Sequence, residues 1–254
     1  MESRWAHEWQ LPVYGFDLFE HLVNFWNVLL EDPNGLADKF EELGSSKEAH
    51  VENADKLLRS EMTQKLLVGF EDDYAKKLFP KDEWFKFSDL DMAAMYLQNM
   101  HFSYGPRFLG CWTELNAEPE RLTKFVRRIR KYKNPNLKVG LSPFDEVIPN
   151  FPDSLIYLDP PYYLADDGGN KMSGGLYPSS EIRTHHDYFD HELMRDQLHN
   201  HRGPFILSYN DCPTIREYYK DFKQEFPVWH YSYSQGTGGK TESHEILILK
   251  DVEV

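Results

Sequence analysis

One short apolar run is followed directly by residues whose types and order suit a defined kind of chemistry. The run "SLIYL" (154–158) has the composition of a buried strand. The residues that come after it are Asp159, Pro160, Pro161, Tyr162 and Tyr163. Each proline removes a backbone N–H and fixes its own φ, so the strand must stop there and the chain beyond it is stiff. A carboxylate and an immobilised carbonyl are therefore expected at the end of this strand.

Such a pair of acceptors suits an amino group attached to an aromatic ring. That group is a poor nucleophile because its lone pair is delocalised into the ring. If Asp159 accepts one amino hydrogen and the carbonyl of Pro160 accepts the other, a pyramidal nitrogen is favoured and its lone pair points at an electrophile. Tyr162 and Tyr163 would stack on the ring, an interaction worth about 1–3 kcal/mol per base. The alternative interpretation is a rigid turn without a chemical role. The surrounding pattern of strands and helices favours the chemical role over this alternative.

The elements that must position these residues alternate between strand and helix. Residues 11–30 change from a short apolar stretch to an amphipathic helix, and the later segments continue the alternation. We expect strands over 137–141, 154–158, 204–209, 228–234 and 244–250, and helices over 187–201, capped by Asp187, and 212–222. The pattern predicts an α/β fold with a mostly parallel sheet, whose ligands bind at the carboxyl ends of the strands. Residues at such ends include Asp17, Asp159, Ser208, Tyr209 and Asn210.

About 100 residues with a polar and mostly helical pattern interrupt this alternation. A helix is expected over 88–100 within this stretch. We therefore predict a catalytic domain made of residues 1–35 and 136–254, with residues 36–135 inserted as a helical lobe.

Charge is unevenly distributed along the chain. The net charge is −14, whereas the run "KFVRRIRKYK" (124–133) holds six basic residues and no acidic one. A solvated helix face explains this run, and so does a patch that contacts phosphates. In the second interpretation the contacting residues are Arg127, Arg128, Arg130 and Lys131.

Several kinds of protein are disfavoured by composition. The two cysteines, Cys111 and Cys212, have no spacing typical of a disulfide framework or a zinc site, so no metal is expected. No apolar run approaches the roughly 20 residues of a membrane span, and the N-terminus lacks the core of a signal peptide. We expect a soluble, cytoplasmic protein that does not associate with membranes.

The tetrapeptide Asp159–Tyr162 resembles the catalytic motif of amino-group methyltransferases that use S-adenosylmethionine (SAM). The flanking segments are similar to those of the Dam-like, alpha-group N6-adenine DNA methyltransferases. The segments that carry this likeness are "VYGFDLFEHLVNFWNVLLEDPNG" (13–35), "FDHELMRDQL" (189–198), "PFILSYNDCPTIREYY" (204–219) and "YSQGTGGKTESHEILILK" (233–250).

The resemblance implies methyl transfer from SAM to the N6 amino group of an adenine flipped out of double-stranded DNA. The catalytic residues would then be Asp159, Pro160, Pro161 and Tyr162. Contacts with SAM are implied for Asp17, Phe144, Asp145 and Asp159, with Asp17 on the ribose hydroxyls. Contacts with DNA are implied for Tyr163, Ser208, Tyr209, Asn210, Arg127, Arg128, Arg130 and Lys131, and the inserted lobe would recognise the target.

The same comparison predicts that one strand is absent. A Dam-like enzyme begins with a strand and a glycine loop that approaches SAM, and this sequence starts about where the second strand belongs. We therefore expect a Rossmann-like methyltransferase sheet that lacks its first strand, with a second polypeptide or a second copy covering the edge. The alternative function is a catalytically impaired relative, or a subunit of a split enzyme, that acts as a binding or regulatory protein.

Overall fold

The computed structural model describes most of the chain as two compact units. Described residues up to Pro143 form the first unit, and those from Phe144 onward form the second. The described ranges are 2–68, 78–105, 107–163, 189–228, 230–231, 241–242 and 245–252. Both units combine helices with strands, which confirms the mixed α/β class. None of the helices in these ranges is long and apolar enough to span a membrane.

In its described residues the first unit is mainly helical and carries one pair of parallel strands. β1 (Val13–Asp17) and β2 (Leu137–Leu141) run side by side, and helix α2 packs against both. The helices are α1 (Glu2–Glu8), α2 (Glu20–Glu31), α3 (Pro33–Glu42), α4 (Lys47–Leu58), α5 (Glu61–Val68), α6 (Asp89–Phe102) and α7 (Pro119–Arg130), with short 3₁₀ helices η2 (Lys81–Glu83) and η3 (Glu114–Asn116). The predicted strand followed by a helix in residues 11–30 is confirmed.

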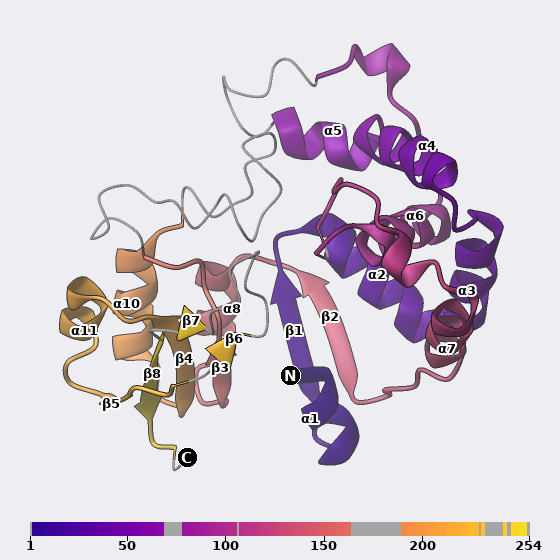
Figure 1. The fold of residues 1–254 in the computed structure, drawn as a ribbon. Coiled ribbons are helices and arrows are strands. Elements are labelled where there is room, and N and C mark those ends of the chain that lie inside the picture. The colour runs from indigo at the N-terminus through magenta and orange to yellow at the C-terminus, as the bar shows by residue number, and fades with distance from the viewer. Residues whose placement is uncertain are drawn as a thin grey trace. The chain divides into compact units, whose positions relative to one another are not determined.

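Helix α6 forms the centre of this unit. Ser88 caps it by accepting a hydrogen bond from the backbone N–H of Asp91 at 3.1 Å. Every residue from Met92 to Asn99 is buried, and helices α2, α3 and α4 pack on α6 (Figure 1). A helix that is buried around its whole circumference lies inside a bundle rather than on its surface. The helix predicted over 88–100 is confirmed, and it forms the core of the first unit.

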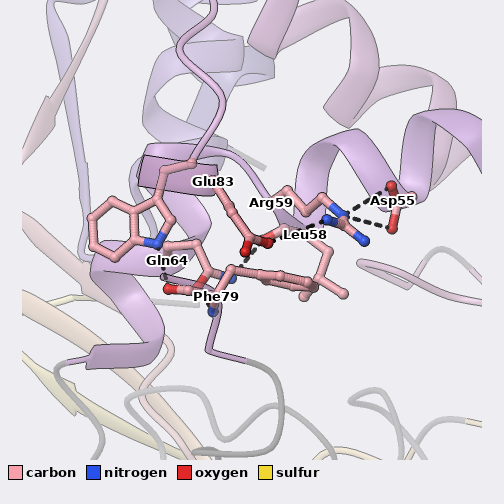
Figure 2. Close-up of polar contacts among 7 residues, drawn as sticks. Asp55, Leu58, Arg59, Gln64, Phe79 and Glu83 are labelled. Atoms are coloured by element: carbon pink, nitrogen blue, oxygen red, sulfur yellow. Dashed lines mark hydrogen bonds and ion pairs between the residues drawn. The ribbon is translucent and has the colours of Figure 1, made fainter. Parts of the chain in front are cut away.

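A polar corner ties residues 78–87 to the turn between α4 and α5 (Figure 2). Arg59 bonds Asp55 at 3.1 Å and stacks over the ring of Phe79 at 4.2 Å. The fully buried Gln64 accepts a hydrogen bond from the backbone N–H of Phe79 at 2.9 Å. These contacts hold the segment against the helices although its own regular structure is one short 3₁₀ helix.

The second unit is built on a sheet with the strand order β3-β4-β8-β5. Its strands are β3 (Ile156–Leu158), β4 (Phe205–Asn210), β5 (Lys223–Glu225) and β8 (Glu245–Lys250), and a separate pair is formed by β6 (His230–Tyr231) and β7 (Thr241–Glu242). β3 and β4 are parallel, whereas β8 is antiparallel to both β4 and β5. The expectation of a mostly parallel sheet is therefore wrong for the described strands. Parallel pairing needs a crossover, which α10 provides between β3 and β4, whereas later strands pair without one.

In the described residues of this unit, three helices pack around its core. They are α8 (Phe144–Asn150), α10 (His191–Asn200) and α11 (Pro213–Tyr218). Met194 and Leu198 of α10 pack with the fully buried Phe205 and Leu207 of β4. Asp190 caps α10 by accepting from the N–H of Leu193 at 2.8 Å. The cap therefore lies three residues beyond the predicted Asp187, which falls outside the described residues.

Candidate active site

The loop after β3 begins at the carboxyl edge of the second unit's sheet. Leu158 is the last residue of β3 and lies opposite Leu207, so β4 continues for three residues beyond that point. Asp159 is exposed, whereas Pro160, Pro161 and Tyr162 are half-buried. The prolines explain why the ladder ends, because neither can donate a backbone hydrogen bond. The acid predicted at a strand end is therefore exposed to solvent, whereas the three residues that follow it are half-buried.

Asn210, the last residue of β4, binds the backbone of this loop with both ends of its side-chain amide. Its Oδ1 accepts from the N–H of Tyr163 at 2.8 Å, and its Nδ2 donates to the carbonyl of Tyr163 at 2.7 Å. This pair of hydrogen bonds resembles one step of a β-ladder in which a side-chain amide replaces the backbone of the second strand. Asn210 was predicted as a substrate contact, and the structure shows its amide engaged with the loop.

Glu245, the first residue of β8, holds the neighbouring tyrosine. The hydroxyl of Tyr162 donates to Oε1 of Glu245 at 2.8 Å, and Glu245 is 9% exposed. Sequence reasoning missed this residue. The available signal was an acidic side chain at the first position of the apolar strand 245–250, where a charge needs a partner.

Aromatic side chains surround Tyr163. Its ring packs edge-to-face on the rings of His191 and Tyr218, with ring centroids 5.2 Å and 6.1 Å away, respectively. A hydrogen bond of 2.6 Å joins Nδ1 of His191 to the hydroxyl of Tyr209. Burial lowers the pKa of His191 to about 4, against the opposing effect of Asp190. The imidazole is therefore neutral near pH 7 and supports Tyr163 as an uncharged ring.

The other predicted residues of β4 lie deeper. Ser208 is buried, and Tyr209 is fully buried in the hydrophobic core. Burial raises the pKa of Tyr209, so its hydroxyl stays protonated. Tyr209 thus reaches the loop through His191, and its own side chain is not at the surface.

The predicted cofactor residues are divided between the two units. Asp17 is exposed at the end of β1 in the first unit, and its Oδ1 accepts from the N–H of Phe19 at 2.7 Å. Phe144 and Asp145 begin α8 in the second unit. The ring of Phe144 lies 4.8 Å from that of Phe189, and the Asp145 side chain is exposed.

Helix α7 carries two opposite stripes of side chains. One stripe packs into the first unit and consists of Leu122, Phe125, Val126 and Ile129. The other stripe, which we call the basic stripe, consists of the exposed residues Lys124, Arg127, Arg128 and Lys131. No carboxylate in the described part of the chain forms an ion pair with these four cations.

Arg130, which was predicted to belong with them, has a different environment. Its guanidinium bonds Asp38 at 2.7 Å and Glu41 at 2.5 Å, so it ties α7 to α3. Lys124 belongs to the predicted basic run 124–133 but was not named among its contacting residues, and its exposure places it in the basic stripe.

Two comparisons with known proteins bear on the chain's identity. No curated protein matches the sequence. The family model described as D12 class N6 adenine-specific DNA methyltransferase matches residues 4–234. The matched range includes Asp17, helix α7 and the loop from Asp159 to Tyr163, and it ends before Glu245. The chain belongs to the D12 class N6 adenine-specific DNA methyltransferase family.

Proposed function

We propose that the protein transfers a methyl group from SAM to the N6 amino group of an adenine in double-stranded DNA. Membership of the family supports the acceptor. The observation that carries the proposal is the loop after β3, where Asp159 is exposed while Tyr162 and Tyr163 are held by hydrogen bonds. Because its substrate would be DNA, the protein would act inside the cell.

In the proposed mechanism the adenine leaves the duplex, at a cost of a few kcal/mol, and enters the site at this loop. Asp159 accepts one N6 hydrogen and the carbonyl of Pro160 accepts the other, so the nitrogen lone pair is directed away from the ring. Tyr162 stacks on the base. When bound, SAM supplies an electrophilic methyl group. The chain provides orientation and charge stabilisation, and Asp159 accepts the proton that the amino group loses.

The residues at the proposed cofactor positions fit SAM in their chemistry. The carboxylate of Asp17 is an acceptor at a strand end, which suits the two ribose hydroxyls as donors. Phe144 offers an apolar ring, and the exposed Asp145 offers an acceptor for the amino group of the cofactor's adenine. We assign these roles, and that of Asp159 beside the methyl group, as part of the proposal.

DNA contact is proposed for the helical residues 36–135, inserted as a target-recognition lobe into a catalytic domain of residues 1–35 and 136–254. The basic stripe supports this role, because its four cations stand on one exposed helix face and form no ion pair with a carboxylate of the described residues, in a chain with a net charge of −14. Each phosphate neutralised by such a side chain releases counterions, which favours binding.

We also propose that a further strand, from a second polypeptide or a second copy, covers the edge of β1. Within the described ranges, β2 is the one strand that pairs with β1. An edge of this kind attracts other strands. Light scattering across a concentration series tests this, and a monomer at all concentrations contradicts a second copy.

The function is tested by incubating the purified chain with labelled SAM and unmethylated duplex DNA, followed by nuclease digestion. We expect label in N6-methyladenine. Calorimetry of SAM binding to the wild type and to Asp17→Ala separates cofactor binding from transfer. Label in cytosine, or SAM binding without any transfer, would contradict the proposal.

A further inference from the structure

We infer that Asn210 and Glu245 are positioning residues for the loop after β3, and that each holds one of two consecutive tyrosines. The catalytic consequence of this inference rests on the proposed function, whereas the mechanical part does not. Neither residue need touch a substrate to act in this way.

The contribution of Asn210 follows from what the prolines remove. Main-chain pairing between β3 and β4 ends at Leu158 and Leu207. The half-buried backbone N–H and carbonyl of Tyr163 still require partners, because unpaired buried polar groups are costly. The amide of Asn210 satisfies both groups, at 2.8 and 2.7 Å. It thereby extends the pairing of these two strands past the prolines by means of a side chain.

Glu245 acts from the neighbouring strand. Asn210 and Glu245 lie opposite each other at the end of the antiparallel ladder between β4 and β8. The ladder beneath them is rigid, because Ile246 and Ile248 of β8 are completely buried. Glu245 accepts the hydroxyl of Tyr162 at 2.8 Å, so the direction of that ring is set by the same cross-strand pair.

The hydrogen bonds at Tyr162 and Tyr163 also restrain the reactive end of the loop, which consists of Asp159 and Pro160. Asp159 and Pro160 lie two to four residues before the two tyrosines, and both Pro160 and Pro161 have fixed φ angles. With β3 holding one end and the cross-strand pair holding the other, the Asp159 carboxylate and the Pro160 carbonyl are confined. Small misplacements of such groups reduce turnover more than they reduce binding.

Hydrogen exchange at the Tyr163 amide tests the inference without SAM or DNA. In the wild type this N–H should exchange slowly, because it donates to Oδ1 of Asn210. Asn210→Ala removes both bonds and should speed exchange at Tyr163 by about 10- to 100-fold, while Asn210→Asp keeps one acceptor and should give a smaller increase. Asn200→Ala is the matched control, since Asn200 also donates to a backbone carbonyl, that of Asp196, far from the loop in sequence.

The inference is overturned if Tyr163 keeps its protection in both Asn210 variants, or if the β4 and β8 amides lose protection to the same extent. If Asn210→Ala does not fold, hydrogen exchange at the Tyr163 amide is measured in two other variants. Asn210→Asp removes the hydrogen bond that Asn210 donates, and Tyr162→Phe removes the hydrogen bond to Glu245. In transfer assays, Asn210→Ala and Glu245→Leu should lower kcat with little change in KM for DNA, and Glu245→Gln should recover most of the loss. If the wild type transfers no methyl group, the proposed function fails. Exchange in the Asn210 variants still decides whether Asn210 positions the loop, and exchange in Tyr162→Phe, which removes the hydrogen bond to Glu245, decides the same for Glu245.

Discussion

Asn210 and Glu245 form a cross-strand pair at the end of β4 and β8, and their side chains hold the adjacent residues Tyr163 and Tyr162. The stiffness of the loop after β3 therefore has two sources. Its prolines restrict the backbone locally, and strands that lie 47 and 83 residues further along the chain restrain it from outside. A rigid loop with one exposed carboxylate suits a reaction that depends on orientation more than on covalent chemistry.

The first prediction concerns Asp159. Asp159→Asn keeps the shape of the side chain and removes its charge, so the amino group loses its strongest acceptor. We expect kcat to fall on the order of 100- to 1,000-fold, with the free energy of unfolding changed by less than about 0.5 kcal/mol, since the side chain is exposed. Single-turnover methylation and urea unfolding measure the two quantities. Asp153→Asn, which removes another exposed carboxylate of the same unit, should keep full activity.

The second prediction concerns the basic stripe of α7. Replacing Arg127 and Arg128 together by alanine should weaken binding to any DNA sequence. It should also reduce the slope of log affinity against log salt by about 1.8, as expected for two phosphate contacts. Arg130→Ala is the control on the same helix, because its guanidinium is engaged with Asp38 and Glu41. Fluorescence anisotropy at several salt concentrations gives the slopes, and equal losses in both variants would refute a specific role for the stripe.

The third prediction is a loss of stability in acid that originates at His21. Its side chain is 1% exposed, its Nε2 lies 2.9 Å from the hydroxyl of Thr63, and burial lowers its pKa from 6.5 to about 3. Between pH 6.5 and about pH 3, His21 is protonated in the unfolded chain and neutral in the folded chain. The free energy of unfolding should therefore fall as pH drops from 6.5 towards 3, by up to about 1.4 kcal/mol per pH unit for this group.

Urea unfolding at about pH 7.5 and about pH 5.5 measures this dependence. His21→Gln should lower stability at neutral pH and flatten the slope below pH 6.5. Part of the slope should remain, because burial lowers the pKa of His191 in the same direction. An unchanged slope in His21→Gln would assign the acid sensitivity to other groups.

Local patterns allowed much of this fold to be predicted from the sequence. The apolar run before Asp159 and the two prolines after it define a strand end through chemistry that acts within a few residues. The strand over 137–141 and the helix around 88–100 also follow from composition and periodicity. These features depend on neighbours along the chain, and a single sequence displays them directly.

Contacts between distant segments were not predictable in this way. Arg130 looks like its neighbours in a basic run, and only the fold brings Glu41 to it across 89 residues. Glu245 looked like the polar start of a strand, because nothing local indicates that it faces Tyr162. The antiparallel direction of β8 likewise depends on how the chain returns, which composition does not encode.

The last prediction concerns Gly203, which lies between α10 and β4 against the chain that enters β3. A Cβ at this position would lie 2.5 Å from the carbonyl oxygen of Ser154 and 2.6 Å from the carbonyl carbon of Asp153. Gly203→Ala must therefore displace the start of β3, and we expect the free energy of unfolding to fall by about 1–3 kcal/mol.

Gly15→Ala is the matched control, because the nearest atom that a Cβ at Gly15 in β1 would meet in the described residues is Cγ2 of Val139, at 3.9 Å. Its effect on urea unfolding should be much smaller than that of Gly203→Ala. Because β3 leads directly into Asp159, Gly203→Ala should also lower methyl transfer under conditions where the protein remains folded. Wild-type stability in Gly203→Ala would mean that the chain around Ser154 can move aside, and the loop after β3 would then depend less on its strand than on Asn210 and Glu245.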